Sequence, residues 1–423
     1  MGQTIGFCGL PVYFAMKILV VNGGSSTFKC WFHDLPSSSL PPEAPRPLWE
    51  ARVEWNAGAQ TADISIAGAA AFSLSAPTLV HPLPTVLESL WTGATRAIES
   101  PREIKAVGHR IVHGGKAYRE TTRLTPEVRT EIRRQAEFAP SHNRFELEAV
   151  EAVDRVLGPG VDQIAVFDTA FHATLEPAAY VYPGPLEWLD RGIRRYGFHG
   201  ISYQYATRRA AQLLARPVES LRLVLCHLGN GGSLAAVRAG KSVDTTMGFT
   251  PLEGLMMGTR SGSLDPGILI YLLRHAGYTA DRLDQILNRE SGLQGVSGLS
   301  GDMRTITAAM ESGNEHARLA FEIYAHRLCQ AAGSMLAVLG GADALVFTGG
   351  IGENSPILRE HLCRQLAFLG VRLDPARNAR NSADSDIAEP DSPVRVLVIH
   401  AEEDWEIARE CLQLVEKHRT DSL

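Results

Sequence analysis

The sequence lacks the marks of a membrane protein, a nucleic-acid binder or a disulfide-rich domain. No apolar run in its 423 residues approaches the roughly 20 residues that a membrane-spanning helix needs. Asp and Glu outnumber Lys and Arg by 47 to 41, so neither a nucleic-acid partner nor a membrane is expected. The six cysteines are scattered without a CxxC pair, which favours reduced thiols and a cytoplasmic location.

The first residues do not resemble a secretory signal. Residues 1–15 are apolar, but they contain no Lys or Arg and are interrupted by Pro11. Met16 and Lys17 then open a strand-like run. We interpret residues 1–15 as an N-terminal extension, or as sequence that precedes a true start at Met16.

Strand-like apolar runs alternate with helical periods along the chain, which predicts an α/β fold. A long helix is expected over residues 314–339, and a polar surface loop over residues 378–392. Cap residues predict four helix starts, at Thr85 (with Glu88), Thr125, Asp265 and Ser355. The predicted strands are 18–21, 106–109, 163–167, 223–228, 344–348 and 394–399.

One pattern occurs twice. Residues 18–26 form a strand-like run that ends in a Gly/Ser turn, and residues 223–233 repeat this pattern; another apolar stretch follows each. The repeat is typical of a duplicated domain with a cleft between the copies, or of two unrelated hairpins.

Three glycine-rich segments favour a phosphate-containing ligand. They are the turns at 22–26 and 229–233, and the segment 349–354, which follows a predicted strand and precedes a helix. Glycine lets backbone N–H groups approach an anion closely, and Lys29 adds a cation near the first turn. None of the three is a Walker motif, because GxxxxGK[ST] is absent.

Several charged residues lie in places that suit ligand binding. Arg110 and Arg260 have glycines nearby and could bind carboxylate or phosphate through their planar guanidinium groups. Asp168 ends a predicted strand, and His199 precedes a helix expected near Ser202. Each of these residues, taken alone, is more often a structural or surface group.

Long blocks in one order resemble the acetokinase family, which includes acetate, propionate and butyrate kinases. The resemblance runs from about residue 17 to residue 408. The blocks are VNGGSSTFK at 21–29, GHRIVHGG at 108–115, FDTAFHATLEP at 167–177, GIRRYGFHGIS at 192–202, HLGNGGSLAAV at 227–237, VDTTMGFTPLEGLMMGTRSG at 243–262, SGDMR at 300–304 and FTGGIGENS at 347–355.

The resemblance implies an α/β fold of two duplicated ribonuclease-H-like domains, as in the sugar-kinase/heat-shock/actin superfamily, around an active-site cleft. The N-terminal extension is then 1–15, the N-terminal domain 16–168 plus 400–423, and the C-terminal nucleotide-binding domain 169–399. The implied reaction is reversible, in-line phosphoryl transfer from ATP to a short-chain carboxylate, giving acyl phosphate and ADP. Acetate is the favoured substrate. Magnesium, with manganese as an alternative, and a cytoplasmic homodimer are also implied.

Other functions remain open at this point. The same chemistry on propionate or butyrate is the nearest alternative. A non-catalytic ATP-binding chaperone or an actin-like protein would share the fold but would not need Arg110, His199 or Arg260. A sugar kinase would need a general base for a hydroxyl group.

The resemblance also implies roles for individual residues, which match the family by position. The catalytic residues are Asp168, His199 and Arg260, and the metal residues are Asn22 and Glu403. The substrate-binding residues are Arg110, Val112, Ser141, Phe198 and Pro251. The nucleotide-binding residues are Lys29, His227, Leu228, Gly229, Asn230, Gly231, Asp302, Met303, Arg304, Gly349, Gly350, Ile351, Gly352 and Glu353.

Asp168 is not expected to move a proton in the kinase direction. A carboxylic acid with a pKa near 4.3 is already ionised at neutral pH, so the nucleophile needs no base. We expect Asp168 to orient an arginine or a metal-bound water instead.

The chain departs from the family pattern near these residues. Ser141 replaces a usual Leu, Ser263 a usual Asp and Tyr203 a usual His, and the family's NEE is Glu402-Glu403-Asp404 here. Ser141 makes the expected acyl pocket larger and more polar. A further methylene gains only about 0.8 kcal/mol on burial, so we hypothesise looser selectivity, with propionate or a small hydroxy acid tolerated.

Overall fold

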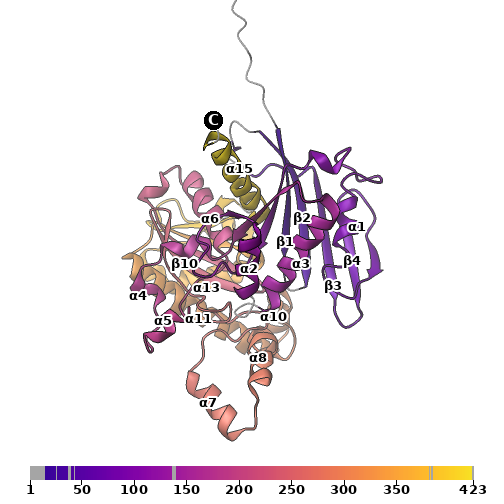
Figure 1. Ribbon diagram of the computed structural model, residues 1–423. Helices are drawn as coiled ribbons and strands as arrows, with labels where there is room; N and C mark the ends of the chain where they lie inside the picture. The colour runs from indigo at the N-terminus through magenta and orange to yellow at the C-terminus, as the bar shows by residue number, and fades with distance from the viewer. Residues whose placement is uncertain are drawn as a thin grey trace, which may run out of the picture. The chain divides into compact units, whose positions relative to one another are not determined.

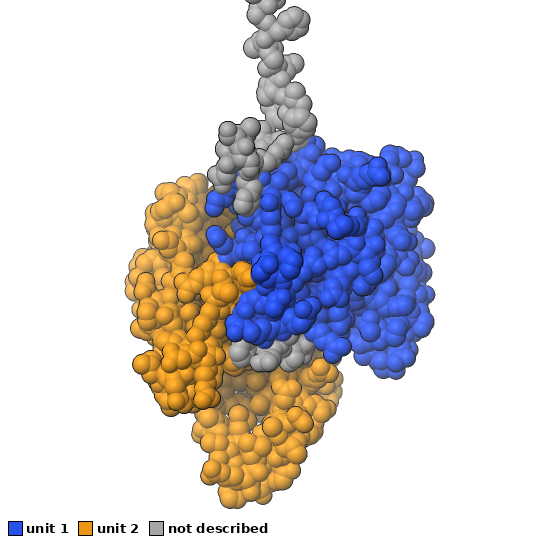
Figure 2. Space-filling view, in the orientation of Figure 1, with its two compact units in different colours: residues 1–113, 120–167, 404–423 blue, residues 114–119, 168–403 orange. Residues whose placement is uncertain are grey.

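The computed structural model describes residues 15–24, 26–36, 40–41, 43–135, 140–380, 382 and 384–421. The chain divides into two compact units, shown in Figure 2. Unit 1 comprises residues 1–113, 120–167 and 404–423, and unit 2 comprises 114–119 and 168–403. The predicted division instead cuts the chain after 168 and after 399. The expected extension 1–15 lies outside the described residues except for Ala15, which begins a strand.

Unit 1 is built on an eight-stranded sheet with the order β5-β4-β3-β2-β1-β6-β8-β7. β1, β2 and β3 pair antiparallel, whereas β1, β6 and β8 pair parallel. The strands are β1 (Ala15–Gly23), β2 (Thr27–Pro36), β3 (Trp49–Asn56), β4 (Thr61–Ile66), β5 (Phe72–Ser75), β6 (Ala106–Ile111), β7 (Thr122–Arg123) and β8 (Asp162–Phe167), and Figure 1 labels β1 to β4.

Unit 2 repeats this topology in a six-stranded sheet with the order β11-β10-β9-β12-β14-β13. The first three strands again pair antiparallel, and β9, β12 and β14 pair parallel. The strands are β9 (Arg222–Leu228), β10 (Gly232–Arg238), β11 (Lys241–Thr245), β12 (Ala344–Thr348), β13 (Ser385–Asp386) and β14 (Arg395–Val398). This shared strand order is the ribonuclease-H-like arrangement that the resemblance implies, and the predicted fold class is confirmed.

Helices cover the sheet of unit 1. Leu19 on β1, Leu83 on α1 and Val153 on α3 are fully buried in one core cluster. α15 packs against β6 at Gly108, where a Cβ atom would lie 2.6 Å from the Cys411 Sγ atom, so glycine permits the contact. The helices are α1 (Leu83–Glu88), α2 (Pro126–Gln135), α3 (Pro140–Leu157) and α15 (Glu403–Asp421).

The core of unit 2 lies between its sheet and α11. Leu328 and Ala332 on α11 share a buried cluster with Val224 on β9 and Leu345 on β12. The helices of this unit are α4 (Pro177–Tyr180), α5 (Glu187–Asp190), α6 (Gly200–Leu213), α7 (Pro266–His275), α8 (Ala280–Arg289), α9 (Gly292–Ser297), α10 (Met303–Glu311), α11 (Glu315–Leu339), α12 (Gly349–Asn354), α13 (Pro356–Gln365) and α14 (Pro375–Arg380).

The predicted helix caps are borne out in part. Asp265 accepts a hydrogen bond from the first turn of α7, and Thr125 precedes α2. The long helix predicted over 314–339 is α11, which Asn314 caps. Ser355 precedes α13 but makes no capping hydrogen bond. The Thr85 prediction is wrong, because Pro84 suits the first turn of a helix and α1 already begins at Leu83.

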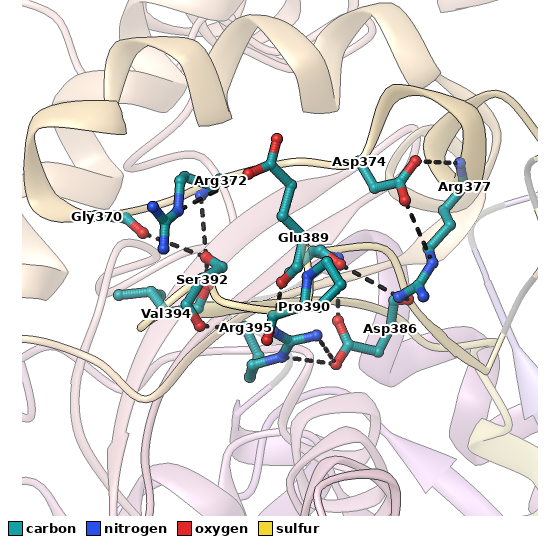
Figure 3. Close-up of polar contacts among 11 residues, drawn as sticks. Gly370, Arg372, Asp374, Arg377, Asp386, Glu389, Pro390, Ser392, Val394 and Arg395 are labelled. Atoms are coloured by element: carbon teal, nitrogen blue, oxygen red, sulfur yellow. Dashed lines mark hydrogen bonds and ion pairs between the residues drawn. The ribbon is translucent and has the colours of Figure 1, made fainter.

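The prediction of a polar surface loop over 378–392 is also wrong in part. α14 extends to Arg380, β13 pairs with β14, and Ile387 and Ala388 are buried. Figure 3 shows why the acidic residues do not simply solvate a loop: they pair with arginines. The figure shows the ion pairs Arg372–Glu389 and Arg395–Asp386, and the pair Arg377–Asp374 next to this segment. Asp391 also pairs with Arg372.

Among the described helices, none has the length and apolar character needed to cross a membrane. Cys30, Cys226, Cys329, Cys363 and Cys411, the cysteines of the described residues, are free thiols.

Three buried histidines predict a loss of stability in mild acid. Burial lowers the pKa values of His109, His113 and His172 to about 4. Because an unfolded histidine titrates near 6.5, the unfolded chain binds these protons between about pH 6.5 and pH 4 and the native chain does not. The free energy of unfolding therefore decreases as the pH is lowered through this window, by about 1.4 kcal/mol per pH unit for each histidine.

Urea unfolding midpoints measured between pH 6.5 and pH 5.0 check this expectation. His172→Asn should flatten the pH dependence by about a third, since it removes one of three such histidines. His81→Gln, at an exposed histidine, is the matched control. A midpoint that stays constant over this range would contradict the prediction.

Candidate active site

A cavity of about 610 Å³ in unit 2 brings together three segments that lie far apart in the sequence. They are the turn after β9, the start of α10, and the region where α12 meets α13. The lining residues are Gly229, Asn230, Gly301, Asp302, Met303, Arg304, Thr307, Gly350, Ile351, Asn354 and Ser355.

Seven of these residues belong to the predicted nucleotide set, and four do not. Gly301, Asn354 and Ser355 lie in the sequence blocks SGDMR and FTGGIGENS, next to residues that were predicted to bind the nucleotide, so this proximity could have identified them. Thr307 lies one helical turn after Met303 on α10, and helical spacing alone could have found it.

The start of α10 is shaped by Asp302. Its side chain caps the helix by accepting a hydrogen bond from the Arg304 amide at 2.9 Å. The Arg304 guanidinium also donates to the Asp302 carboxylate at 2.7 Å and lowers the pKa of Asp302. The Arg304 side chain is mostly exposed, so it remains accessible to a charged ligand.

The glycine-rich segment after β12 forms the first turn of α12. Gly349 has a positive φ of 78°, and a Cβ atom there would lie 2.9 Å from the Leu228 carbonyl oxygen, so only glycine fits well. The Glu353 carboxylate accepts hydrogen bonds from the Gly349 and Ala401 amides, at 3.0 Å and 3.1 Å. It also pairs with His400, and this bond raises the pKa of His400 to about 9.

These contacts divide the predicted residues Gly349–Glu353 into two groups. Gly350 and Ile351 line the cavity, whereas the Glu353 carboxylate is engaged within unit 2 and is not among the lining groups. The buried Arg359 guanidinium donates to the carbonyl oxygens of Gly352 and Glu353 and so holds the end of α12. The segment is therefore a rigid turn, with two of its residues facing the cavity.

Asp168 and His199 lie against each other through their backbones. The Gly200 amide donates to the Asp168 carbonyl oxygen at 2.9 Å. A Cβ atom on Gly200 would stand 2.2 Å from that oxygen, so glycine is required for the approach. His199 takes the left-handed conformation, with φ of 59°, at the start of α6. Strain of this kind is often found at functional sites.

His199 and Arg260 meet at the turn between β9 and β10. An atom placed at the Cβ position of Gly231 would lie 3.3 Å from Arg260 Nη1 and 3.5 Å from His199 Nε2. The His227 ring stacks on the His199 ring, with centroids 4.2 Å apart. Arg260 Nη1 also donates to the Pro251 carbonyl oxygen at 3.2 Å. Unit 2 thus gathers most of the predicted catalytic and pocket residues.

The segment that carries Pro251 is held by a residue whose role the sequence did not reveal. Arg195 Nη1 donates to the carbonyl oxygens of Thr245, Thr246 and Met247, and its Nη2 donates to Glu253 at 2.7 Å. Tyr182 also bonds to Glu253. The signal was the second arginine in GIRRYGFHGIS, but nothing local distinguishes it from the first.

The remaining predicted residues belong mainly to unit 1. Asn22 and Lys29 face each other across the β1–β2 pair. Arg110 Nη1 donates to the Gly23 carbonyl oxygen at 3.0 Å. The buried Val112 donates from its amide to Glu146, and the side chain of Ser141 lies outside the described residues. Glu403 begins α15 and is the last residue of unit 2.

Residues 17–409 match the model of the acetokinase family. The chain belongs to the acetokinase family. It is 57% identical over 401 residues to the acetate kinase of Gloeobacter violaceus, covering 94% of this chain and 99% of that protein.

Two solved structures of other acetokinase-family proteins share the fold. The acetate kinase of Porphyromonas gingivalis has a TM-score of 0.86 at 37% identity, with 95% of this chain and 100% of that chain covered. A propionate kinase of Francisella tularensis has a TM-score of 0.84 at 33% identity, with 93% and 98% covered.

The contact between Gly258 and the cavity gives a testable prediction for this acetokinase-family chain. A Cβ atom at Gly258 would stand 2.3 Å from Asn230 Oδ1 and 3.0 Å from the Gly301 carbonyl oxygen, and both residues line the cavity. Gly258→Ala should therefore displace the cavity wall. We expect MgADP binding to weaken about tenfold, since overpacking costs roughly 1–3 kcal/mol.

Isothermal titration calorimetry with MgADP measures the effect. Gly333→Ala is the matched control, because Gly333 lies in α11 with open space at its Cβ position. An unchanged dissociation constant for Gly258→Ala would mean that this cavity is not the nucleotide site.

Proposed function

We propose that this chain transfers the γ-phosphoryl group of ATP reversibly to a short-chain carboxylate, with acetate as the first candidate. One observation carries the proposal. His199 Nε2 and Arg260 Nη1 both lie beside Gly231, and the neighbouring Gly229 and Asn230 line the 610 Å³ cavity. Two side chains that can bind the moving phosphoryl group therefore stand next to the turn that contacts the nucleotide.

The reaction requires positioning rather than acid–base chemistry. A carboxylate oxygen attacks the γ-phosphorus, the bond from that phosphorus to the β–γ bridging oxygen breaks, and ADP leaves with that oxygen. No proton needs to move, because the carboxylate is ionised at neutral pH. Negative charge spreads over the three equatorial oxygens of the moving group, and His199 and Arg260 donate to them.

The carboxylate substrate is assigned to Arg110, whose guanidinium can bind both of its oxygens. Val112, Ser141, Phe198 and Pro251 are proposed to surround its alkyl part. Asp168 is buried, and its backbone is tied to the start of α6, so we assign it an orienting role toward an arginine or a bound water. Lys29, His227 and the turn residues around them are assigned to the nucleotide.

We assign a magnesium or manganese ion to Asn22 and Glu403, because their amide and carboxylate oxygens are the kind of ligand that such an ion prefers. Magnesium in such sites takes one or two protein oxygens and completes its shell with water and phosphate oxygens. Among the described residues, no group of three or more His, Cys, Asp or Glu side chains is arranged to hold a metal ion, and a magnesium site of this kind does not need one. When bound, the ion neutralises charge on the phosphate oxygens.

The identity of the acyl group is the part of the proposal that depends most on one residue, Ser141. Ser141 occupies the position where the family pattern has leucine, so propionate or butyrate is the nearest alternative substrate. A non-catalytic ATP-binding protein would need the cavity but not the pair formed by His199 and Arg260. The free thiols of the described cysteines agree with the cytoplasmic location that we propose.

An acid panel tests the reaction. With MgATP and hydroxylamine, the chain should release ADP and yield hydroxamate with acetate, and at a lower rate with propionate. Ser141→Leu should raise the acetate-to-propionate ratio of kcat/KM about fourfold, the equivalent of 0.8 kcal/mol for one methylene. Formate, butyrate, lactate and glycerol complete the panel.

Val338→Leu is the matched control, since Val338 is an exposed residue on α11 and is not one of the residues assigned to the pocket. An unchanged acetate-to-propionate ratio of kcat/KM in Ser141→Leu would show that Ser141 does not set the selectivity for the acyl group. The absence of hydroxamate with every acid would overturn the carboxylate kinase proposal itself.

We also propose that two copies of the chain associate through α7. No residue of this helix is buried, and Ile268, Ile270 and Tyr271 are 45%, 49% and 62% exposed. In Figure 1, α7 lies at the tip of an excursion from unit 2. Asp265 stands at its N-terminal end and Arg274 at its C-terminal end. Antiparallel packing against a second α7 would therefore bring opposite charges together and bury both apolar faces.

Light scattering after gel filtration tests this surface. The parent chain should have twice the 46.0 kDa mass of one chain, and Tyr271→Glu should have the mass of one. Phe368→Glu is the matched control, because Phe368 is an apolar residue of the same unit that is 81% exposed. A dimer that survives Tyr271→Glu, or one that Phe368→Glu equally breaks, would contradict the assignment to α7.

A further inference from the structure

His199 is held from behind by a buried pair of hydroxyl groups. Its Nδ1 atom lies 2.8 Å from the Ser233 Oγ atom. Ser233 Oγ in turn lies 2.5 Å from the Tyr203 hydroxyl. Ser233 and Tyr203 are both fully buried, so water does not compete for these bonds. The opposite ring nitrogen, Nε2, is the one beside Arg260 and Gly231.

Tyr203 remains a proton donor in this setting. Burial raises the pKa of its hydroxyl well above its usual value, so the phenol is protonated at neutral pH. Among the described residues, Ser233 Oγ is the acceptor within reach of that proton. A buried donor without an acceptor costs about 1–3 kcal/mol, so Tyr203 donates to Ser233.

The direction of the first bond sets the direction of the second. Once Ser233 Oγ accepts from Tyr203, its own proton has His199 Nδ1 as its acceptor in the described structure. In the reverse order, His199 Nδ1–H would donate to Ser233 and Ser233 to Tyr203, and the Tyr203 proton would have no acceptor. Only the first order gives both hydroxyl protons, that of Tyr203 and that of Ser233, an acceptor.

We propose that Tyr203 is a positioning residue for the proposed phosphoryl transfer: through Ser233, it keeps the proton of His199 on Nε2. The proposal rests on the proposed function for its catalytic consequence. Nε2–H is then always ready to donate to an equatorial phosphoryl oxygen next to Arg260. Tyr203 stands where the family pattern has a histidine, so this phenol is a feature of this chain.

A double-mutant cycle tests the relay. Tyr203→Phe should lower kcat about tenfold, the equivalent of one hydrogen bond, and leave both KM values within about twofold. Ser233→Ala should lower kcat at least as much. Because Tyr203 acts through Ser233, the double variant should be no slower than Ser233→Ala alone. Tyr203→His should retain more activity than Tyr203→Phe, since its ring N–H can still donate.

Tyr324→Phe is the matched control. Tyr324 is a buried tyrosine of the same unit, and its hydroxyl has no hydrogen-bond partner among the described residues. Its removal should leave kcat unchanged. Equal kcat in Tyr203→Phe and Tyr324→Phe, or additive losses in the double variant, would overturn the proposal. If Tyr203→Phe does not fold, the kcat values of Ser233→Ala and Tyr203→His are compared instead. The relay predicts the lower kcat for Ser233→Ala, and equal values would overturn it.

The tautomer can be observed directly, without turnover. In protein labelled with ¹⁵N-histidine, the His199 signals, assigned by their loss in His199→Gln, should show the Nε2–H form alone. Tyr203→Phe should populate the Nδ1–H form, because a Ser233 hydroxyl freed from Tyr203 can accept as well as donate. An unchanged spectrum would overturn the relay. A parent chain that makes no acyl phosphate would overturn the proposed function, and the spectrum would still decide the relay.

Discussion

The antiparallel register of β9 and β10 is the constraint on which the site in unit 2 depends. It pairs His227 with Ser233 and Leu228 with Gly232, and it leaves a three-residue turn between them. The His227 ring and the Ser233 hydroxyl consequently both contact His199, while Gly231 lies beside Arg260. A slip of one residue would turn Ser233 to the other face of the sheet and separate these groups.

Close backbone approaches are the second condition. Gly200 lies against the Asp168 carbonyl, Gly258 against Asn230, and Gly349 against the Leu228 carbonyl. Side chains at these positions would separate segments that the site brings together. In a helix or strand, glycine destabilises the folded state by about 0.5–1 kcal/mol relative to alanine, because it loses more conformational entropy on folding. Its repeated use here is therefore explained by the close approaches that it permits.

Much of the fold could be predicted from local pattern. All six predicted strands exist, because buried parallel strands have continuous apolar runs that stand out in the sequence. The errors arose where distant residues decide the outcome. The acidic residues around 378–392 seemed to solvate a loop, but Asp386 and Asp391 pair with Arg395 and Arg372. Arg195 was passed over because its partners, the carbonyl oxygens of residues 245–247, are supplied by another segment.

By itself, the sequence determined the fold class, the family and the chemical types of the candidate catalytic side chains. These are carried by contiguous blocks such as GIRRYGFHGIS, whose meaning does not depend on distant contacts. Only the tertiary structure decided which residues share one cavity, and that the Tyr203 hydroxyl, Ser233 and His199 lie in one hydrogen-bonded row. The physical reason is that cavity walls and proton directions depend on which donors and acceptors meet in space, and strand register and close packing set those meetings.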